Sequence, residues 1–329
     1  MSRPSDIIDV HAHSMLRSWY MFLANKFAPE PPRMEGVAIP DWSPEHAIET
    51  MDEHGIRAMV LSNPIGTKGM AAADAIPLSR RMNDELAEVV SRHPRRFGAF
   101  GVLPLQDVDS ALAELEYAID VLGFDGVCLQ TSFDGAYPGD PRFDPILAAL
   151  DLRGTTAFVH PASSSYMSAI ELPVIAGLLE YPFETTRAAV SLILSGARRR
   201  YPNFHYISTH AGGTLPYLAN RIAFVVGRRG TGFKEQLSTE EITTDLKTIH
   251  FDLAIAYSRP QLLALREVVP IDHILMGFDY PMAARQTIGP SLDALDHAGV
   301  FNADELNMIA CENALAILPR LAKRLGSLG

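Results

Sequence analysis

The chain alternates short apolar runs with longer segments of helical periodicity along almost all of its 329 residues. The runs are rich in β-branched residues, as buried strands of parallel sheets are, and each is followed by a stretch long enough for a crossover helix. Eight strands joined by eight helices close a (β/α)₈ barrel. The sequence therefore predicts an α/β chain of the TIM-barrel class, whose strands are expected at Ile7–His13, Arg57–Pro64, Phe97–Leu105, Phe124–Thr131, Thr155–Pro161, Phe204–Ala211, His250–Ala256 and Ile274–Pro281.

Helices are expected between these runs, and one more is expected after them. Because barrels of about 250 residues or more form one domain, residues 1–329 are expected to be a single domain. A ninth helix, Ala303–Leu318, is expected to begin after Asn302 as its N-cap and to pack outside the closed ring. The eight covering helices are expected at Pro44–His54, Ser79–Arg92, Asp109–Leu122, Pro141–Leu152, Thr185–Tyr201, Leu215–Val226, Pro260–Val268 and Ile288–Ala298.

Two stretches after predicted strands are too long for ordinary connections. Residues 14–43 contain aromatic side chains and several prolines, so they are too apolar for a mobile linker and too interrupted for one helix. We expect an inserted flap over about residues 14–43. A second long loop is expected over 163–184. Both follow strands, and both are therefore expected at the C-terminal face, where barrel active sites are built.

Composition excludes several classes of partner. A net charge of −11 argues against a nucleic-acid footprint, and the short cluster Arg198–Arg200 is expected to be a solvated helix end. No stretch approaches the roughly 20 apolar residues of a membrane span, so no membrane partner is expected and a cytoplasmic location is predicted. The two cysteines, Cys128 and Cys311, are too few for a disulfide framework or a zinc knuckle. Any metal must be held by histidine and carboxylate.

Five side chains of that kind fall where predicted strands end. They are His11 and His13, His160, His210 and Asp279, on the first, fifth, sixth and eighth strands. Strand ends meet at one mouth of a barrel, and residues i and i+2 of a strand face the same side, so both histidines of the first strand can reach one ion. Imidazole and carboxylate ligands suit zinc, and manganese or iron(II) less selectively. The pattern predicts a catalytic divalent metal with an open coordination position.

The other histidines are more simply interpreted as surface or satisfied core residues. They lie on helices, at helix ends, or at the opposite ends of strands. No role is assigned to His46, His54, His93, His205, His250, His273 or His297.

Four segments carry a resemblance to a known family. They are IIDVHAH, FVHP around His160, PFETTRAAVSLILSGARRRYPNFHYISTHAGGTLPYLANRI, and ILMGFDYP around Asp279. Across nearly the whole chain they resemble the amidohydrolase superfamily, in the branch with aminocarboxymuconate-semialdehyde decarboxylase and the hydroxybenzoate decarboxylases. PFETTRAAVSLILSG and THAGG are most similar to the 6-methylsalicylate decarboxylase group. The resemblance implies that His11, His13, His160 and Asp279 bind one metal ion, and that His210 is a catalytic residue close to it.

The chain also departs from some members of that superfamily. Dinuclear members use a carboxylated lysine at the end of strand four, whereas here GFDGVCLQT ends near Gln130 and contains no lysine. A mononuclear site is therefore predicted. Its imidazole and carboxylate ligands favour zinc, with manganese as the alternative. Some aromatic decarboxylases of the branch begin with Glu-x-His and carry a glutamate after the strand-six histidine, where this chain has His11 and Gly213. These departures leave the phenolic substrate open.

The leading functional hypothesis is metal-dependent, non-oxidative decarboxylation of a small aromatic, hydroxybenzoate-type or enol carboxylic acid. Asp279 would move a proton to the ring carbon that loses carbon dioxide, while His210 orients the phenol or activates water. Alternatively, His210 is the base for a metal-bound hydroxide, which would suit a hydrolase or hydratase of a lactone, ester or unsaturated acid. A catalytically inactive binding barrel would require lost ligands, and all are present.

Substrate contacts and assembly are the remaining predictions. The substrate carboxylate can be held by a guanidinium, for which Arg17, Arg221 and Arg285 are the candidates. Phe278 is a candidate for an apolar wall against the ring. The resemblance also implies a homodimer or homotetramer.

Overall fold

Eight parallel strands form one sheet in the order β1-β4-β5-β6-β7-β8-β9-β10. The computed structural model describes residues 6–164, 174–229, 232–233 and 236–326. The Val10 N–H donates to the Met276 carbonyl at 3.0 Å, and Ala12 pairs with Tyr280 in parallel, so the sheet curves back on itself as a barrel. The predicted (β/α)₈ fold is confirmed. Its strands are β1 (Ile7–His13), β4 (Ile56–Ser62), β5 (Phe97–Val102), β6 (Gly126–Gln130), β7 (Thr156–His160), β8 (His205–Ser208), β9 (His250–Asp252) and β10 (Ile274–Leu275).

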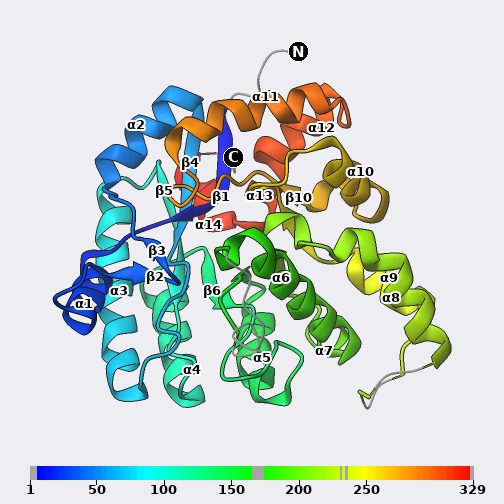
Figure 1. Cartoon of the computed structure of the whole chain (residues 1–329), viewed down its shortest axis with the longest axis horizontal. Coiled ribbons are helices and arrows are strands. Elements are labelled where there is room, and N and C mark those ends of the chain that lie inside the picture. The colour runs from blue at the N-terminus through cyan, green and yellow to red at the C-terminus, as the bar shows by residue number, and fades with distance from the viewer. Residues whose placement is uncertain (1–5, 165–173, 230–231, 234–235, 327–329) are drawn as a thin grey trace.

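Helices surround the sheet, as Figure 1 shows. Helices α3 and α6 begin well before their predicted starts. A sequence pattern would begin each of them after a proline, whereas Pro77 and Pro182 lie inside them. None of the helices in the described ranges is long and apolar enough to cross a membrane. The covering helices are α2 (Pro44–His54), α3 (Ala72–Arg92), α4 (Val108–Glu116) with a π-helical turn η1 (Tyr117–Val121), α5 (Asp144–Arg153), α6 (Ala176–Leu194), α7 (Ala197–Arg200), α8 (Leu215–Arg229), α9 (Thr239–Leu246), α10 (Arg259–Val268) and α11 (Ile288–Ala298).

The stretch after β1 is more regular than its prolines suggested. It contains helix α1 (Arg17–Phe27) and a two-stranded antiparallel hairpin, β2 (Arg33–Met34) with β3 (Val37–Ala38). The Glu85 carboxylate of α3 accepts the first backbone N–H groups of α1, from Arg17 at 2.6 Å and Ser18 at 2.9 Å. The buried Trp19 donates from its indole to the Gly66 carbonyl. These contacts fix α1 on the outside of the barrel.

The C-terminal segment covers the N-terminal end of the barrel. It comprises α12 (Ala303–Asn307), a π-helical turn η7 (Met308–Glu312), α13 (Asn313–Ile317) and α14 (Pro319–Leu325). Asn302 caps α12, as predicted, and the Glu305 side chain completes a capping box. Ile317, Leu321 and Leu325 pack into the same apolar cluster as inward-facing side chains of the strands. The segment therefore plugs the barrel, which leaves the opposite mouth for a site.

Arg198 corrects one expectation from the sequence. Its side chain is buried rather than solvated: it donates to the Thr248 hydroxyl at 2.7 Å and to the Phe204 carbonyl at 3.1 Å. The guanidinium thus satisfies hydrogen-bond acceptors in the segments that precede β8 and β9. Composition alone does not reveal this role.

Three histidines without a predicted role meet at the plugged end. His205 and His250 begin β8 and β9, and His273 precedes β10. The rings of His250 and His273 stack with centroids 4.2 Å apart, and His205 lies 5.4 Å from His250. Burial, then the neighbouring His273, His205 and Arg198, lower the pKa of His250 from 6.5 to about 2. His250 is thus neutral in the folded protein.

This neutrality predicts acid sensitivity. Unfolded chains protonate His250 below pH 6.5 whereas the folded protein resists, so its contribution to stability is complete above that pH and is lost as the pH falls. The loss approaches about 1.4 kcal/mol per pH unit for one proton. His250→Phe is expected to flatten the dependence of the unfolding free energy on pH between 7 and 5. The exposed His46→Gln serves as the control. A His250→Phe protein with the wild-type pH slope would contradict this assignment.

Candidate metal centre

The five side chains selected at strand ends meet at the open mouth of the barrel. His11 and His13 are on β1, His160 ends β7, His210 begins the turn η4 (His210–Gly212) after β8, and Asp279 follows β10. Neighbouring imidazole rings have centroids 4.7–5.8 Å apart. One ligand atom from each of four of these residues, all except His13, lies within 4.8 Å of the others. His13 directs its Nε2 to Asp279 Oδ1 at 2.9 Å.

Hydrogen bonds orient both histidines of β1. The Nδ1 of His11 lies 3.0 Å from Asp252 Oδ2, and the Nδ1 of His13 lies 2.8 Å from the Ser62 hydroxyl. The Ser62 hydroxyl donates to the Ala12 carbonyl, so it accepts from His13. With Nδ1 acting as donor in each ring, the lone pair of the neutral imidazole is on Nε2, which faces the mouth.

These inward-facing atoms make no hydrogen bond, although His11 Nε2 and His13 Nε2 lie 3.5 and 2.9 Å from Asp279 Oδ1. Among the described residues, His11 Nε2, His13 Nε2 and Asp279 Oδ1 are buried and make no hydrogen bond. Buried polar atoms are normally satisfied, and a divalent cation bound between them would satisfy all three together. Two imidazole nitrogens and a carboxylate oxygen, with His160 alongside, are ligands that suit zinc or manganese. The residues present therefore fit a bound metal ion.

The charges of the cluster depend on the surrounding carboxylates. Burial alone would lower the pKa of His11, but Asp252 and Asp279 raise it to about 10. Burial would raise the pKa of Asp279, yet the adjacent histidines hold it well below its ordinary value. Burial lowers the pKa of His13 and places that of His160 well below 6.5. Two neutral imidazoles and a carboxylate are thus available, and a divalent cation can replace the proton on His11.

Unusual backbone geometry aims two of these side chains. His210 (φ 55°) and Asp279 (φ 62°) adopt the left-handed conformation, which costs about 1–2 kcal/mol for a non-glycine residue. The His210 N–H donates to Asp252 Oδ1 at 3.1 Å, and the Asp279 N–H donates to the His11 carbonyl at 2.8 Å. A Cβ on Gly277 would lie 2.7 Å from the Cβ of His11, so only glycine allows this approach of the two strand ends. Strain held by such contacts is common at functional sites.

Sequence reasoning missed Asp252, which touches both His11 and His210. Its carboxylate is fully buried at the end of β9. The rule that selected the other residues applied to it, but the seventh strand was predicted to run to Ala256, which placed Asp252 in its interior. Asp9 was also missed: burial raises its pKa to about 8, and its Oδ1 accepts the backbone N–H of His11.

The predicted substrate contacts are less well placed than the metal ligands. Phe278 is buried next to Asp279. Arg17 and Arg221 are exposed. Arg285 forms ion pairs with two glutamates of α2 at 2.5 and 3.5 Å. Two of the three arginines thus face solvent, and the third is paired with glutamates of α2.

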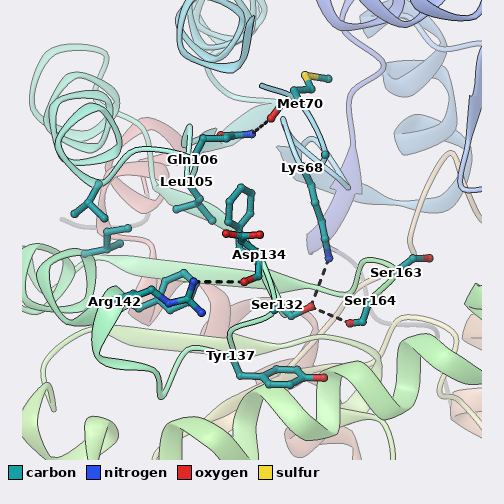
Figure 2. A pocket seen from close by; sticks show the side chains of 16 residues that line it. Lys68, Met70, Leu105, Gln106, Ser132, Asp134, Tyr137, Arg142, Ser163 and Ser164 are labelled. Atoms are coloured by element: carbon teal, nitrogen blue, oxygen red, sulfur yellow. Dashed lines mark hydrogen bonds between the residues drawn. The ribbon is translucent and has the colours of Figure 1, made fainter. Parts of the chain in front are cut away.

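A cavity of about 810 Å³ lies between the connections that follow β4, β5, β6 and β7. Figure 2 shows Lys68 reaching into it toward Ser132 and Ser164. The Lys68 ammonium donates to the Ser132 hydroxyl at 3.5 Å and to the Ala162 carbonyl at 3.4 Å, two residues beyond His160. Its described lining includes none of the five residues of the metal centre, so the cavity lies beside that centre.

Comparisons with known proteins agree with this geometry. The family described as amidohydrolase matches residues 8–320. The 6-methylsalicylic acid decarboxylase acuB of Aspergillus aculeatus is 34% identical over 88% of this chain and 89% of its own. Decarboxylase yanB of Aspergillus niger is 31% identical over 96% and 88%. The crystal structure of 5-carboxyvanillate decarboxylase LigW from Sphingomonas paucimobilis has the same fold, with a TM-score of 0.84 and 22% identity over 95% of this chain and 99% of that one.

The contacts of Asp252 generate a prediction about metal affinity. Asp252→Asn keeps the shape of the side chain but removes the charge that orients His11 Nε2. Loss of such an outer partner typically costs 10–100-fold in metal affinity. We expect that weakening for zinc in a titration against a competing chelator, with the exposed Asp41→Asn as the control. Equal affinity in wild type and Asp252→Asn would show that the bond does not tune the ligand.

Proposed function

Because this chain belongs to the amidohydrolase family, we propose that its open barrel mouth decarboxylates a small aromatic carboxylic acid of the hydroxybenzoate type, without an oxidant. The observation that carries the proposal is a set of buried atoms with lone pairs, on His11, His13 and Asp279, that make no hydrogen bond. The names of the two fungal relatives support it, since both are called decarboxylases.

The proposed metal ligands are His11, His13, His160 and Asp279, with zinc preferred over manganese. Imidazole-rich donor sets support zinc. A dihydroxybenzoic acid decarboxylase from Polaromonas, with bound manganese, shares the fold at a TM-score of 0.76, so manganese is the second candidate metal. When bound, the ion supplies Lewis-acid stabilisation of negative charge on the carboxylate and phenolic oxygens of the substrate.

The side chains around the ion handle the proton. His210 Nε2 lies 3.7 Å from Asp279 Oδ2, so both side chains can reach one substrate bound at the mouth. In the proposed reaction this pair delivers a proton to the ring carbon that bears the carboxylate. The bond from that carbon to the carboxylate then breaks, its electron pair restores the aromatic ring, and carbon dioxide leaves. His210 also orients the phenolic oxygen.

We further propose that the protein forms a homo-oligomer. Helices α6 and α8 pack against each other and expose large apolar side chains, which in water favour burial in an interface. These side chains are Leu178, Leu179, Phe183, Tyr217, Phe224 and Val225. Light scattering gives the molar mass that decides between monomer, dimer and tetramer.

A direct test is a panel of 2-hydroxybenzoates, followed by the release of carbon dioxide. We expect turnover by the zinc- or manganese-loaded protein, its abolition by chelation, and its recovery when the metal returns. His160→Ala should lower metal occupancy. Hydrolysis of lactones or esters without carbon dioxide release would favour a hydrolase, and full activity in metal-free protein by elemental analysis would contradict the proposal.

A variant of His210 tests whether this residue acts in catalysis or binds the metal. Because we place it beside the ion as an acid–base or orienting group, His210→Ala should retain about one metal per chain. It should lose roughly 10²–10⁴ in kcat, the usual effect of removing a positioned acid–base group. Loss of the ion in this variant would show that His210 is a ligand, a role that its position beside His11, His160 and Asp279 allows. A variant with the wild-type kcat would remove it from the mechanism.

A further inference from the structure

The tip of the flap hairpin touches the connection that follows a metal ligand. Glu35 and Gly36 form the two-residue turn between β2 and β3, and both have positive φ, 48° and 84°. Tight hairpins require this conformation, which glycine adopts readily and glutamate does not. A non-glycine residue keeps such a conformation where surrounding contacts fix it. For Glu35 those contacts lie outside the flap.

The Glu35 carboxylate accepts three hydrogen bonds from the barrel side. The Ser163 N–H donates to Oε1 at 2.8 Å, and the Ser163 hydroxyl donates to Oε2 at 2.7 Å. The Tyr181 hydroxyl also donates to Oε2. Ser163 is three residues after His160 and lines the cavity beside the metal centre, where Figure 2 labels it. We call Glu35, Ser163 and Tyr181 the flap clasp.

Tyr181 joins the flap clasp to the metal centre. Its ring meets the His160 ring edge-on, with centroids 6.2 Å apart and planes at 79°. The next residue, Pro182, abuts the connection after β8, since a Cβ on Gly213 would lie only 1.9 Å from the Pro182 carbonyl oxygen. The backbone of Tyr181 is thus held against the segment that carries His210, and its hydroxyl is held by the flap.

We propose that Glu35 is a positioning residue that fixes the ring of Tyr181 as one wall of the substrate pocket beside His160. This inference rests on the proposed function, because the wall would select among flat aromatic acids. A tethered ring offers one surface to the substrate, whereas an untethered ring rotates and lowers the complementarity to any one shape. Neither residue needs to exchange a proton for this role.

The test is a double-mutant cycle between Glu35 and Tyr181 in the metal-loaded protein. Glu35→Ala and Tyr181→Phe remove the same tether from opposite ends. Each is expected to raise KM for the preferred 2-hydroxybenzoate about tenfold, with kcat within about threefold of wild type and metal content unchanged. The double variant should resemble either single variant, because the shared bond is lost only once. Glu35→Gln, which retains one acceptor oxygen, should fall between wild type and Glu35→Ala.

Matched controls distinguish the clasp from general damage to the flap. Glu30→Ala and Tyr20→Phe change exposed residues of the same flap and should leave KM unaltered. The discrimination between 2-hydroxybenzoates with small and large ring substituents should narrow in Glu35→Ala and Tyr181→Phe alone. Additive effects on KM in the double variant, or a loss of kcat with KM unchanged, would overturn the proposal.

A second measurement does not depend on turnover. The two tryptophans of the chain, Trp19 and Trp42, both lie in the segment between β1 and α2, so intrinsic fluorescence reports on the flap. Acrylamide quenching should increase in Glu35→Ala and Tyr181→Phe and stay at the wild-type level in Glu30→Ala. Unchanged quenching in both variants would contradict the claim that the flap clasp holds the flap in place. Increased quenching in the variants, together with no binding or decarboxylation of aromatic acids by wild type, would support the flap clasp and contradict the proposed function.

Discussion

The contact between β1 and the segment after β10 closes the barrel, and the metal centre depends on this closure. The Asp279 N–H donates to the His11 carbonyl at 2.8 Å, and the His13 N–H donates to the Tyr280 carbonyl at 2.7 Å. These two bonds bring the first and last strands of the sheet into register. Without them the histidines of β1 and the carboxylate after β10 would lie at opposite edges of an open sheet. Gly277 permits the approach, since any side chain there would strike His11.

Electrostatics then determine what the mouth can bind. His11 lies between the carboxylates of Asp252 and Asp279. The cluster therefore has more atoms with free lone pairs than it has N–H groups to pair with them. Phe158 and other apolar side chains lie beneath His11, inside the barrel. In such surroundings unpaired donors and charges are costly, and a divalent cation offsets that cost for several groups at once. The same low-polarity surroundings would strengthen the stabilisation of charge that develops on a bound aromatic acid.

The fold and the grouping of the candidate site residues could be predicted from the sequence because both depend on simple periodicities. The alternation of strands and helices predicts the barrel, and the rule that strand ends share one face places His11, His160 and Asp279 together. Asp252 was missed because β9 is only three residues long and its end cannot be located from an apolar run that continues into a loop. Tertiary packing determines where a strand ends, and a local sequence pattern contains no information about that packing.

The flap was the least predictable part, for a related reason. Its prolines and aromatic residues indicated an insertion, but α1 depends on Glu85 from another helix, and the β2–β3 turn depends on contacts with Ser163 and Tyr181. These partners are distant in sequence, so local propensity carries no signal for them. The ion pairs of Arg285 are a further example, because its glutamate partners on α2 are distant in sequence.

The central claim is that the unpartnered atoms at the barrel mouth are ligands of one metal ion. The most direct measurement is anomalous diffraction from crystals grown with zinc, recorded on both sides of the zinc absorption edge. The account predicts a single strong peak at roughly 2.0–2.2 Å from the Nε2 atoms of His11 and His13 and from an Asp279 oxygen, with His160 completing the protein ligands. Zinc-replete crystals that show no anomalous peak between these side chains would contradict it.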